Sequence, residues 1–554
     1  MSEPAEILQP VRLGAASVLL ASGTIVSRIL GFLKVAVLAA AIGQLGSASA
    51  DAFAVANQLP NNIYALIAGG VLSAVLVPQV VKASRGADGG SAYINKIVTV
   101  GVVGFAAVTL IATLLAPALV DLYSQSTSGG PGFTPAAHAL ATSFAYLCLP
   151  QIFFYAMYSL LSEVLNARNV FGPFTWAPVL NNVVAIVGLV VFMVLFGQAQ
   201  QNSAVSAWSG SGILLLAGTA TLGVAAQAIV LLFFWKRAGL RFRFDFQWKG
   251  VGLSTTGKAA GWLFGMILVT QLAGIVQSRV ASLASGNAAS ISTLQASWLI
   301  FMLPHSIVAV SIATAYFTRM SGHATRGDLP AVRSDLSSSL RGIGLLIVFS
   351  AVALAVVAYP FARFFETEYS KVAATGNVIL AFLPGLVLFS ALFIVQRVFY
   401  ALGDTRTPFI MQCVQSVLFV AGALACTQLP NDWIAVGIAG VTTVAGGTQA
   451  IIALYLVRRR LGGSGGRHIA ARYAQYFGLA LVAGVAGFGL LLLLGGFSAS
   501  GFAQSGRVEA LLSIAIVGVL MSAIYLGLLA LVRSPELAAV AQPLIHRLRR
   551  RGTE

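Results

Sequence analysis

The feature that most constrains this chain is a series of long apolar segments, each close to the length of a membrane-spanning helix. About fourteen of them lie between residues 15 and 532, and a helix of about 20 residues crosses the hydrocarbon core of a bilayer. Only 9% of the 554 residues are charged and 58% are hydrophobic, whereas a soluble domain carries about 25% charged residues. The sequence therefore predicts an all-α polytopic membrane protein and excludes a soluble enzyme, a secreted disulfide-bonded protein and a disordered chain.

Sequence motifs of catalytic or metal chemistry are not found. The three cysteines, Cys148, Cys413 and Cys426, lie in apolar segments without paired spacing, so neither a disulfide framework nor a metal site is predicted. The sequence also contains no Walker-type phosphate-binding loop and no H-E-x-x-H motif. We therefore expect neither an enzyme nor a bound cofactor, and the sequence leaves a coupling ion open.

The formal charge of +17 comes from 33 Lys and Arg against 16 Asp and Glu, and it is concentrated in short connections. If the N-terminus is cytoplasmic, 26 basic residues lie in cytoplasmic connections and tails, and three (Arg363, Lys371 and Arg507) lie on the opposite side. This asymmetry is the positive-inside pattern, so both termini are predicted to be cytoplasmic. Basic and aromatic residues alternate over residues 241–248, as is typical of anchoring at anionic headgroups. We expect contacts with membrane lipids and none with nucleic acid.

Two dipeptides recur along the chain at similar offsets. Leu59-Pro60 recurs as Leu303-Pro304, and Leu149-Pro150 recurs as Leu383-Pro384. In the second pair, a Pro-Phe dipeptide follows the first proline after 23 residues and the second after 24. Segments 1 to 6 and 7 to 12 are therefore interpreted as two copies of a six-helix unit, and they share one orientation because six is even.

The repeat predicts three parts with a cavity between the first two. These parts are an N-terminal lobe over residues 1–240, a C-terminal lobe over residues 241–462, and two further helices with a basic cytoplasmic tail over residues 463–554. The prolines should bend their helices. Such bends suit a rocking motion of the lobes, but proline alone is equally compatible with a static kink that improves packing.

Four basic residues lie within the apolar segments, where a Lys or Arg at the helix centre costs about 2.5–3.5 kcal/mol on insertion scales. Lys34 follows Arg28 by six residues, so the two side chains project about 120° apart. One of them is expected to face the cavity and the other a neighbouring helix. Arg279 and Arg397 lie closer to helix ends, from which a long side chain can reach the interface. His305 is interpreted as a hydrogen-bonded structural histidine.

The sign of the intramembrane charge indicates the class of substrate. The acidic residues lie at segment ends, in connections or in tails, and Asp51 and Glu163 come closest to the membrane interior. A cavity with Arg28 and Lys34 but few carboxylates should attract an anion and repel cations. This argues against a cation or multidrug exporter and favours a phosphate-bearing substrate, which basic side chains bind well.

Several stretches resemble the MurJ/MviN family of lipid II flippases, part of the multidrug/oligosaccharidyl-lipid/polysaccharide exporter superfamily. They are spread over segments 1 to 11, and the last is the most specific. The stretches are SRILGFLK at 27–34, ADAF at 50–53, LPN at 59–61, LNAR at 165–168, APVLNN at 177–182, RGD at 326–328 and FYALGDTRTP at 399–408.

The resemblance implies a fourteen-helix protein of the bacterial plasma membrane with cytoplasmic termini. It implies outward movement of lipid II, the undecaprenyl-pyrophosphate-linked peptidoglycan precursor, during cell-wall synthesis, and a groove for the lipid tail at segments 13 and 14. Arg28 and Lys34 match basic positions of the family's first helix, and Asp51 matches an acidic position at the start of its second helix. With Arg279 from the charge argument, these residues are the predicted substrate-binding set.

Two stretches depart from the family pattern. Residues 62–65 (NIYA) stand where a basic pair usually follows the Pro-Asn of the second helix, and residues 298–300 (WLI) stand where the eighth helix usually carries an arginine. Two alternatives therefore remain: a flippase for another polyprenyl-linked glycan, and a non-transporting scaffold that assembles cell-wall synthesis proteins. A membrane glycosyltransferase is weaker still, because it needs positioned carboxylates and the outer connections offer only scattered ones.

Overall fold

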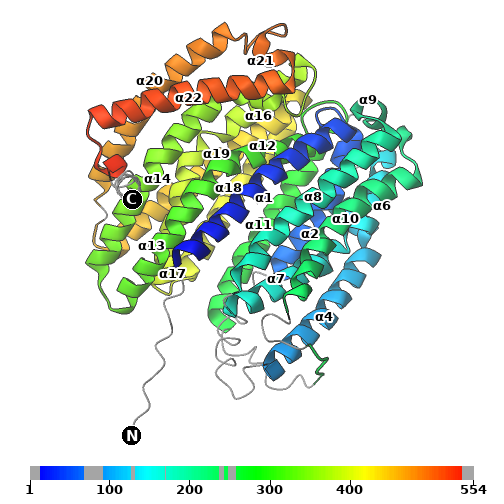
Figure 1. The fold of residues 1–554 in the computed structure, drawn as a ribbon, viewed down its shortest axis with the longest axis horizontal. Helices are drawn as coiled ribbons and strands as arrows, with labels where there is room; N and C mark the ends of the chain where they lie inside the picture. The colour runs from blue at the N-terminus through cyan, green and yellow to red at the C-terminus, as the bar shows by residue number, and fades with distance from the viewer. Residues whose placement is uncertain are drawn as a thin grey trace, which may run out of the picture.

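The computed structural model describes residues 13–67, 91–125, 132–168, 170–235, 242–246, 257–463 and 465–538. The elements of this part are helices, shown in chain order in Figure 1. Thirteen helices or consecutive helix pairs among them are long and apolar enough to cross a membrane. A helix satisfies its own backbone hydrogen bonds, which lipid cannot do for it. The predicted all-α polytopic fold is confirmed.

Thirteen of the predicted apolar segments correspond to these spans. The remaining one, predicted at residues 52–80, begins with α2 (Ala48–Ile67), and its later part lies outside the described residues.

An N-terminal group of helices packs mainly within itself, with α1 and α10 along α8 and α2 along α6. Besides α2, the group comprises α1 (Leu13–Ile42), α4 (Ser91–Leu114), α5 (Ala116–Tyr123), α6 (Pro135–Cys148), α7 (Gln151–Ala167), α8 (Phe171–Phe196), α9 (Ala199–Asn202), η2 (Val205–Ala207) and α10 (Gly210–Phe233).

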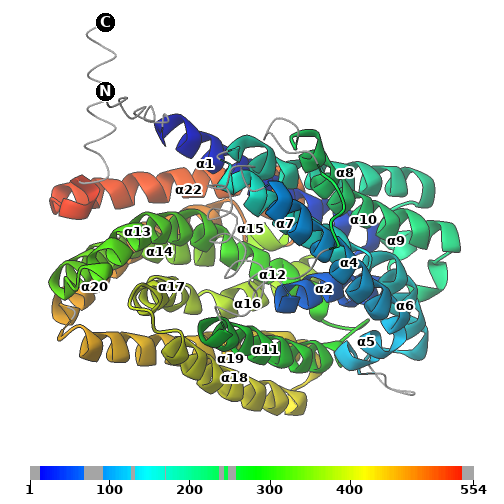
Figure 2. The same cartoon turned by 90° about the horizontal axis from the view of Figure 1, so that it is seen from below.

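A C-terminal group is built in the same way, with α11 along α18, α13 along α14 and α17 along α19. Figure 2 shows the two groups side by side, with α2 and α12 near the middle. The group comprises α11 (Gly257–Ser282), α12 (Ile291–Pro304), η3 (His305–Ala309), α13 (Val310–Thr325), α14 (Leu329–Val356), α15 (Ala358–Ala362), α16 (Tyr369–Phe382), α17 (Gly385–Ala401), α18 (Arg406–Ala425), η4 (Cys426–Gln428) and α19 (Asn431–Arg460).

Helix breaks occur at the matched prolines of the repeat. Pro150 separates α6 from α7, and Pro384 separates α16 from α17. The other pair is less alike, because Pro60 lies inside α2 whereas Pro304 is followed by the π-helical turn η3. Proline removes a backbone donor and crowds the preceding turn, which accounts for the two breaks and the widened turn.

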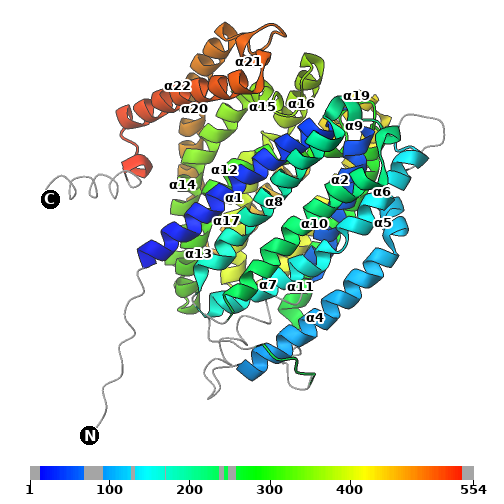
Figure 3. The same ribbon diagram turned by 45° about the vertical axis from the view of Figure 1, so that its right-hand side comes forward.

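The last helices pack mainly on the C-terminal group, where α20 (Gly466–Leu493) lies on α14 and α22 (Arg507–Leu531) lies on α20 and α15. The short α21 (Phe502–Ser505) connects them, as Figure 3 shows. The Tyr525 hydroxyl donates to the Leu345 carbonyl at 2.7 Å, which fixes α22 over α14.

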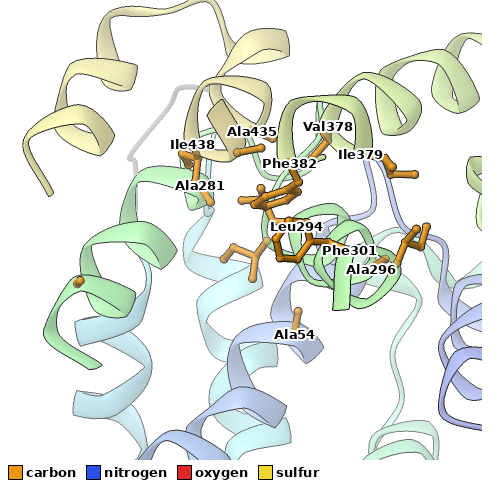
Figure 4. Packing of buried hydrophobic residues seen from close by; sticks show 14 of the residues in the cluster. Ala54, Ala281, Leu294, Ala296, Phe301, Val378, Ile379, Phe382, Ala435 and Ile438 are labelled. Carbon is orange, nitrogen blue, oxygen red and sulfur yellow. The ribbon is translucent and has the colours of Figure 1, made fainter. Parts of the chain in front are cut away.

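The largest cluster of buried side chains extends across both groups. Leu294 and Phe301 of α12 lie beside Phe382 of α16 (Figure 4), and the rings of Phe301 and Phe382 are 6.0 Å apart. Alanines such as Ala54 and Ala281 in the same cluster allow the helix backbones to approach closely. The two groups therefore share part of their core in the middle of the bundle.

Candidate substrate-binding site

Arg28 lines a cavity of about 520 Å³ between α1, α7, α8 and α12. The side chain is exposed, and within the described part of the chain no carboxylate pairs with its guanidinium group. An exposed guanidinium at this depth is a strong anion-binding group. The remaining lining residues are Thr24, Ser27, Gly31, Tyr158, Phe174, Thr175, Pro178, Asn181, Asn182 and Leu299.

Close packing of α1 against α8 positions Arg28. The Asn182 side chain donates from Nδ2 to the Ser27 carbonyl at 3.0 Å, one residue before Arg28. Gly23 permits the approach, because a Cβ there would lie 2.7 Å from the Thr175 side chain. The edge of the cavity that α1 and α8 form is therefore rigid. The C-terminal group contributes Leu299 to the lining.

Lys34 lies in a different cavity, of about 60 Å³, inside the N-terminal group. Its neighbours there include Asn57, Gln151, Tyr155 and Asn181. Asn181 also lines the Arg28 cavity, so one side chain lies between the two sites. The two bases thus diverge as their helical spacing predicts, and Lys34 is placed away from the space between the groups.

Asp51 is fully buried and joins the two groups. Its carboxylate accepts hydrogen bonds from the Ser285 hydroxyl at 2.8 Å, the Ser292 hydroxyl at 2.8 Å and the Ser292 backbone N–H at 3.0 Å. Ser292 belongs to the first turn of α12, where free N–H groups and the helix dipole favour an anion. Asp51 therefore caps a helix of the opposite group.

Further contacts between the groups lie at the same level, which we call the Asp51 end and define by residues 42–51, 121–125, 279–292 and 361–366. Leu45 N–H donates to Glu366 Oε1 at 2.9 Å, and Gln125 N–H donates to Ser282 Oγ at 3.0 Å. Arg279 donates from Nη1 to the Asp121 carbonyl at 2.9 Å. Arg279 is therefore part of this contact and is not beside Arg28.

One aromatic ring from outside these ranges, Phe32, packs against the Asp51 end. The Phe32 ring of α1 packs edge-on against Phe361, Phe364 and Phe365, with ring centroids 6.1, 5.5 and 5.6 Å away. Beside them, burial raises the pKa of the Glu366 carboxyl to about 7. The structure thus spreads the four predicted site residues over three places, with Arg28 in the inter-group cavity, Lys34 inside one group, and Asp51 and Arg279 at the Asp51 end.

A second cavity between the groups, of about 380 Å³, was not predicted from the sequence. We call it the carboxamide cavity, because amide and hydroxyl side chains supply its polar lining and, in the described part of the chain, none of its lining residues is charged. The polar residues are Gln58, Asn62, Thr270, Gln271, Gln277, Ser278, Gln295, Gln415 and Thr442. The large apolar ones include Trp298, Phe382 and Phe419. The sequence feature that could have indicated this cavity is the recurrence of glutamine within apolar segments.

The two other polar residues singled out from the sequence have structural partners. The Arg397 guanidinium stacks over the rings of Phe317, Phe393 and Tyr400 at 4.6–5.9 Å. His305 Nδ1 lies 3.0 Å from the Ser390 hydroxyl, which agrees with the structural interpretation of this histidine.

Comparison with known proteins decides the family. The family model described as lipid II flippase MurJ matches residues 38–504. The chain belongs to the MurJ family. A probable lipid II flippase MurJ from Haemophilus influenzae is 26% identical over 84% of this chain and 89% of its own. A probable lipid II flippase MurJ from Rhizobium meliloti is 25% identical over 77% of each chain.

Solved structures share the fold of this MurJ-family chain. A lipid II flippase MurJ in an inward closed conformation matches with a TM-score of 0.69 at 18% identity, covering 93% of this chain and all of that one. An inward-facing multidrug resistance transporter of the MATE family matches with a TM-score of 0.60 at 16% identity, covering 81% of this chain and 98% of that one. At these identities the likeness concerns the fold alone, which is that of a multi-pass membrane protein.

Proposed function

We propose that this MurJ-family chain moves lipid II across the bacterial plasma membrane by alternating access. The observation that carries the proposal is the exposed guanidinium of Arg28 in a cavity to which both groups contribute. Membership of the family and the two-group architecture support it.

In this mechanism Arg28 binds the pyrophosphate that links the lipid to its head group. A planar guanidinium can donate two parallel hydrogen bonds to phosphate oxygens, and these are stronger in a cavity that excludes bulk water. Lys34, six residues further along α1, contributes positive charge from inside the N-terminal group. Both groups contribute to the cavity, so a relative motion of the groups changes the surroundings of the bound anion.

The Asp51 end acts in this mechanism as a closure. Asp51, Arg279 and Glu366 all bond across the two groups there. The positive-inside pattern supports an outer location for this end and a cytoplasmic location for both chain termini. A reporter fused after Glu554 should then be cytoplasmic, and one inserted near residue 130 should be extracellular. The opposite result at residue 130 would reverse the proposed direction of transport.

Reconstitution of the purified full-length chain tests the function. Proteoliposomes loaded with fluorescent lipid II on one leaflet should transfer it to the other leaflet, and the Arg28→Ala protein should not. Parallel vesicles that contain another undecaprenyl-pyrophosphate-linked glycan test the alternative substrate. Transfer of that lipid but not of lipid II would favour a flippase for another glycan. If the intact chain transfers neither lipid although it is folded and inserted, the flippase assignment is wrong and the scaffold alternative takes its place.

A further inference from the structure

We infer that the carboxamide cavity binds the uncharged, hydroxyl- and amide-bearing sugar part of the lipid-linked substrate, apart from the pyrophosphate that Arg28 holds. The inference rests on the proposed function, since it divides one substrate between two cavities. The volume of about 380 Å³ lies within the range of about 300–1,000 Å³ found for small-molecule sites.

The chemistry of the lining favours a neutral polyol. A carboxamide offers two N–H donors and a carbonyl acceptor, so it can pair with a hydroxyl group in either direction. A phosphate has acceptor oxygens and negative charge, and it is bound best by cationic donors. Among the residues that the structure describes, all those lining the carboxamide cavity are uncharged. The cavity therefore suits sugar hydroxyl and N-acetyl groups better than an anion.

The amide groups are positioned by one another, with capacity left over. Gln58 Nε2 donates to the Ser278 hydroxyl at 3.0 Å, and Gln295 Nε2 donates to Gln58 Oε1 at 3.3 Å. Gln271 Nε2 donates to the Asn62 carbonyl at 2.9 Å. Each carboxamide has more hydrogen-bonding sites than these contacts use. Gln295 is also exposed to the cavity, so it is available to a ligand.

An aromatic surface completes the lining. The Trp298 ring stacks on Phe301 at 4.7 Å and makes T-shaped contacts with Phe382 and Phe389, whose ring centroids are 5.5 and 5.8 Å away. These neighbours hold the indole in one orientation. The face of an aromatic ring carries partial negative charge and attracts the slightly positive C–H groups of a sugar ring. Amides with a fixed aromatic ring thus provide both kinds of contact that a sugar needs.

The carboxamide cavity continues toward α17 and α19. A further cavity of about 320 Å³ shares Thr270 and Gln271 with it, and its lining residues are also uncharged. Gln449 Nε2 donates to Gln412 Oε1 at 3.1 Å, and Gln412 Nε2 donates to Gln415 Oε1 at 2.7 Å. A row of carboxamides therefore leads from the first cavity to the second, which gives room for a head group longer than one sugar.

The position of the cavity links sugar binding to the motion of the groups. Gln58 and Asn62 come from α2 in the N-terminal group, whereas Gln271, Gln295 and Trp298 come from α11 and α12 in the C-terminal group. Asn62 and Trp298 also occupy the two stretches where the family resemblance predicts basic residues. At both positions this chain has a side chain suited to a neutral ligand.

Binding measurements on the full-length protein in detergent separate the two cavities. The probes are undecaprenyl pyrophosphate, which lacks sugars, and lipid II, which carries them. Gln295→Leu and Gln58→Leu should each weaken lipid II binding about three- to tenfold, as expected for one or two lost hydrogen bonds. Neither should change binding of undecaprenyl pyrophosphate by more than about twofold. Arg28→Ala should weaken the binding of both lipids.

Controls keep the outcomes distinct. Gln428→Leu alters an exposed glutamine away from the cavity and should bind both lipids like the unaltered chain. Trp298→Phe should bind lipid II better than Trp298→Ala, and thermal unfolding identifies any variant that fails to fold. The sugar assignment is wrong if the folded Gln295→Leu and Gln58→Leu proteins bind lipid II normally, or if their binding of both lipids is weakened equally. Neither outcome contradicts the proposed flippase function. Failure of the unaltered chain to bind lipid II would instead contradict the proposed function.

Discussion

The two groups of helices meet in different ways at two levels of the bundle. At the Asp51 end, polar groups of one half have partners on the other half, and the Phe32 ring is packed among three phenylalanines. At the level of Arg28, a cavity of about 520 Å³ separates them. Contact between the two groups therefore depends on where buried polar groups find partners across the interface.

Asp51 illustrates the energetic side of this difference. Each hydrogen bond to a charged group contributes about 1.5–3 kcal/mol, and a buried carboxylate without partners is strongly unfavourable. The end can therefore open only if water replaces the three donors that Asp51 now has. Arg28 is already exposed, so a ligand anion meets it without breaking an internal ion pair.

The largest effect is expected at Arg28. Arg28→Ala should abolish growth of a flippase-depleted bacterium and weaken lipid II binding about ten- to a hundred-fold, because a charge-assisted contact to a buried anion is lost. Arg28→Lys should be impaired, since an ammonium group cannot form the paired contact. Growth complementation, with membrane insertion checked by fractionation, measures the effect. Normal growth and normal lipid II binding with Arg28→Ala would show that the cavity at Arg28 is not the pyrophosphate-binding site.

A smaller effect is expected when the closed end is weakened. Asp51→Asn replaces one acceptor oxygen by an N–H₂ group that faces donors from Ser285 and Ser292, so the end should open more often. In a chain without native cysteines, Ala288→Cys, a buried position, should react with maleimide several-fold faster once Asp51→Asn is added. Asp432→Asn, at an exposed acidic residue, is the matched control. Unchanged labelling would show that Asp51 does not hold the end closed.

Glu366 should make the closed end sensitive to pH. Burial, the main cause, raises the pKa of its carboxyl from 4.5 to about 7 and outweighs the Leu45 N–H bond and nearby Lys371, which lower it. Opening admits water and returns the pKa toward 4.5, so the closed arrangement binds the proton more tightly. The closed arrangement is therefore favoured at low pH and loses that stabilisation as the pH rises from about 4.5 through about 7.

Spin labels can measure this pH effect at two exposed positions on opposite groups. With labels at Gln200 and Thr367, the longer-distance population should grow between pH 5 and pH 8. Glu366→Gln should remove most of that change, because a neutral amide does not titrate. Equal pH dependence in both proteins would assign the titration to another group.

The smallest effect is expected for Lys34→Arg. The charge is kept, and the cavity of about 60 Å³ beside Lys34 can take the larger side chain, so lipid II transfer should stay within about twofold. Lys34→Met, which removes the charge at similar length, should reduce transfer more. A large loss with Lys34→Arg would mean that the shape of this inner cavity matters more than its charge.

The sequence predicted the parts of this molecule that depend on local patterns. Hydropathy predicted the spans, the prolines predicted bends that the structure shows as helix breaks at Pro150 and Pro384, and helical periodicity predicted that Arg28 and Lys34 diverge. These features require only the chain's own spacing.

The remaining parts depend on contacts between residues far apart in the chain. Asp51 and Arg279 were assigned to substrate binding, and their partners lie 234 to 241 and 157 to 158 residues away. In the sequence, Glu366 is one of several scattered outer carboxylates. Its contact with Leu45, 321 residues away, is visible only in the structure. Intramembrane charge could not indicate the carboxamide cavity, because its lining residues in the described part of the chain are uncharged.

A reversible lock at the Asp51 end tests alternating access most directly. In a chain whose three native cysteines are replaced, Leu45→Cys and Glu366→Cys put one thiol on each of the two residues that join the groups through a backbone N–H and a carboxylate. After oxidation the locked protein should still bind lipid II but should not transfer it between leaflets, and reduction should restore transfer to the level of the unlocked double variant. Transfer at an unchanged rate while the disulfide is intact would contradict the account.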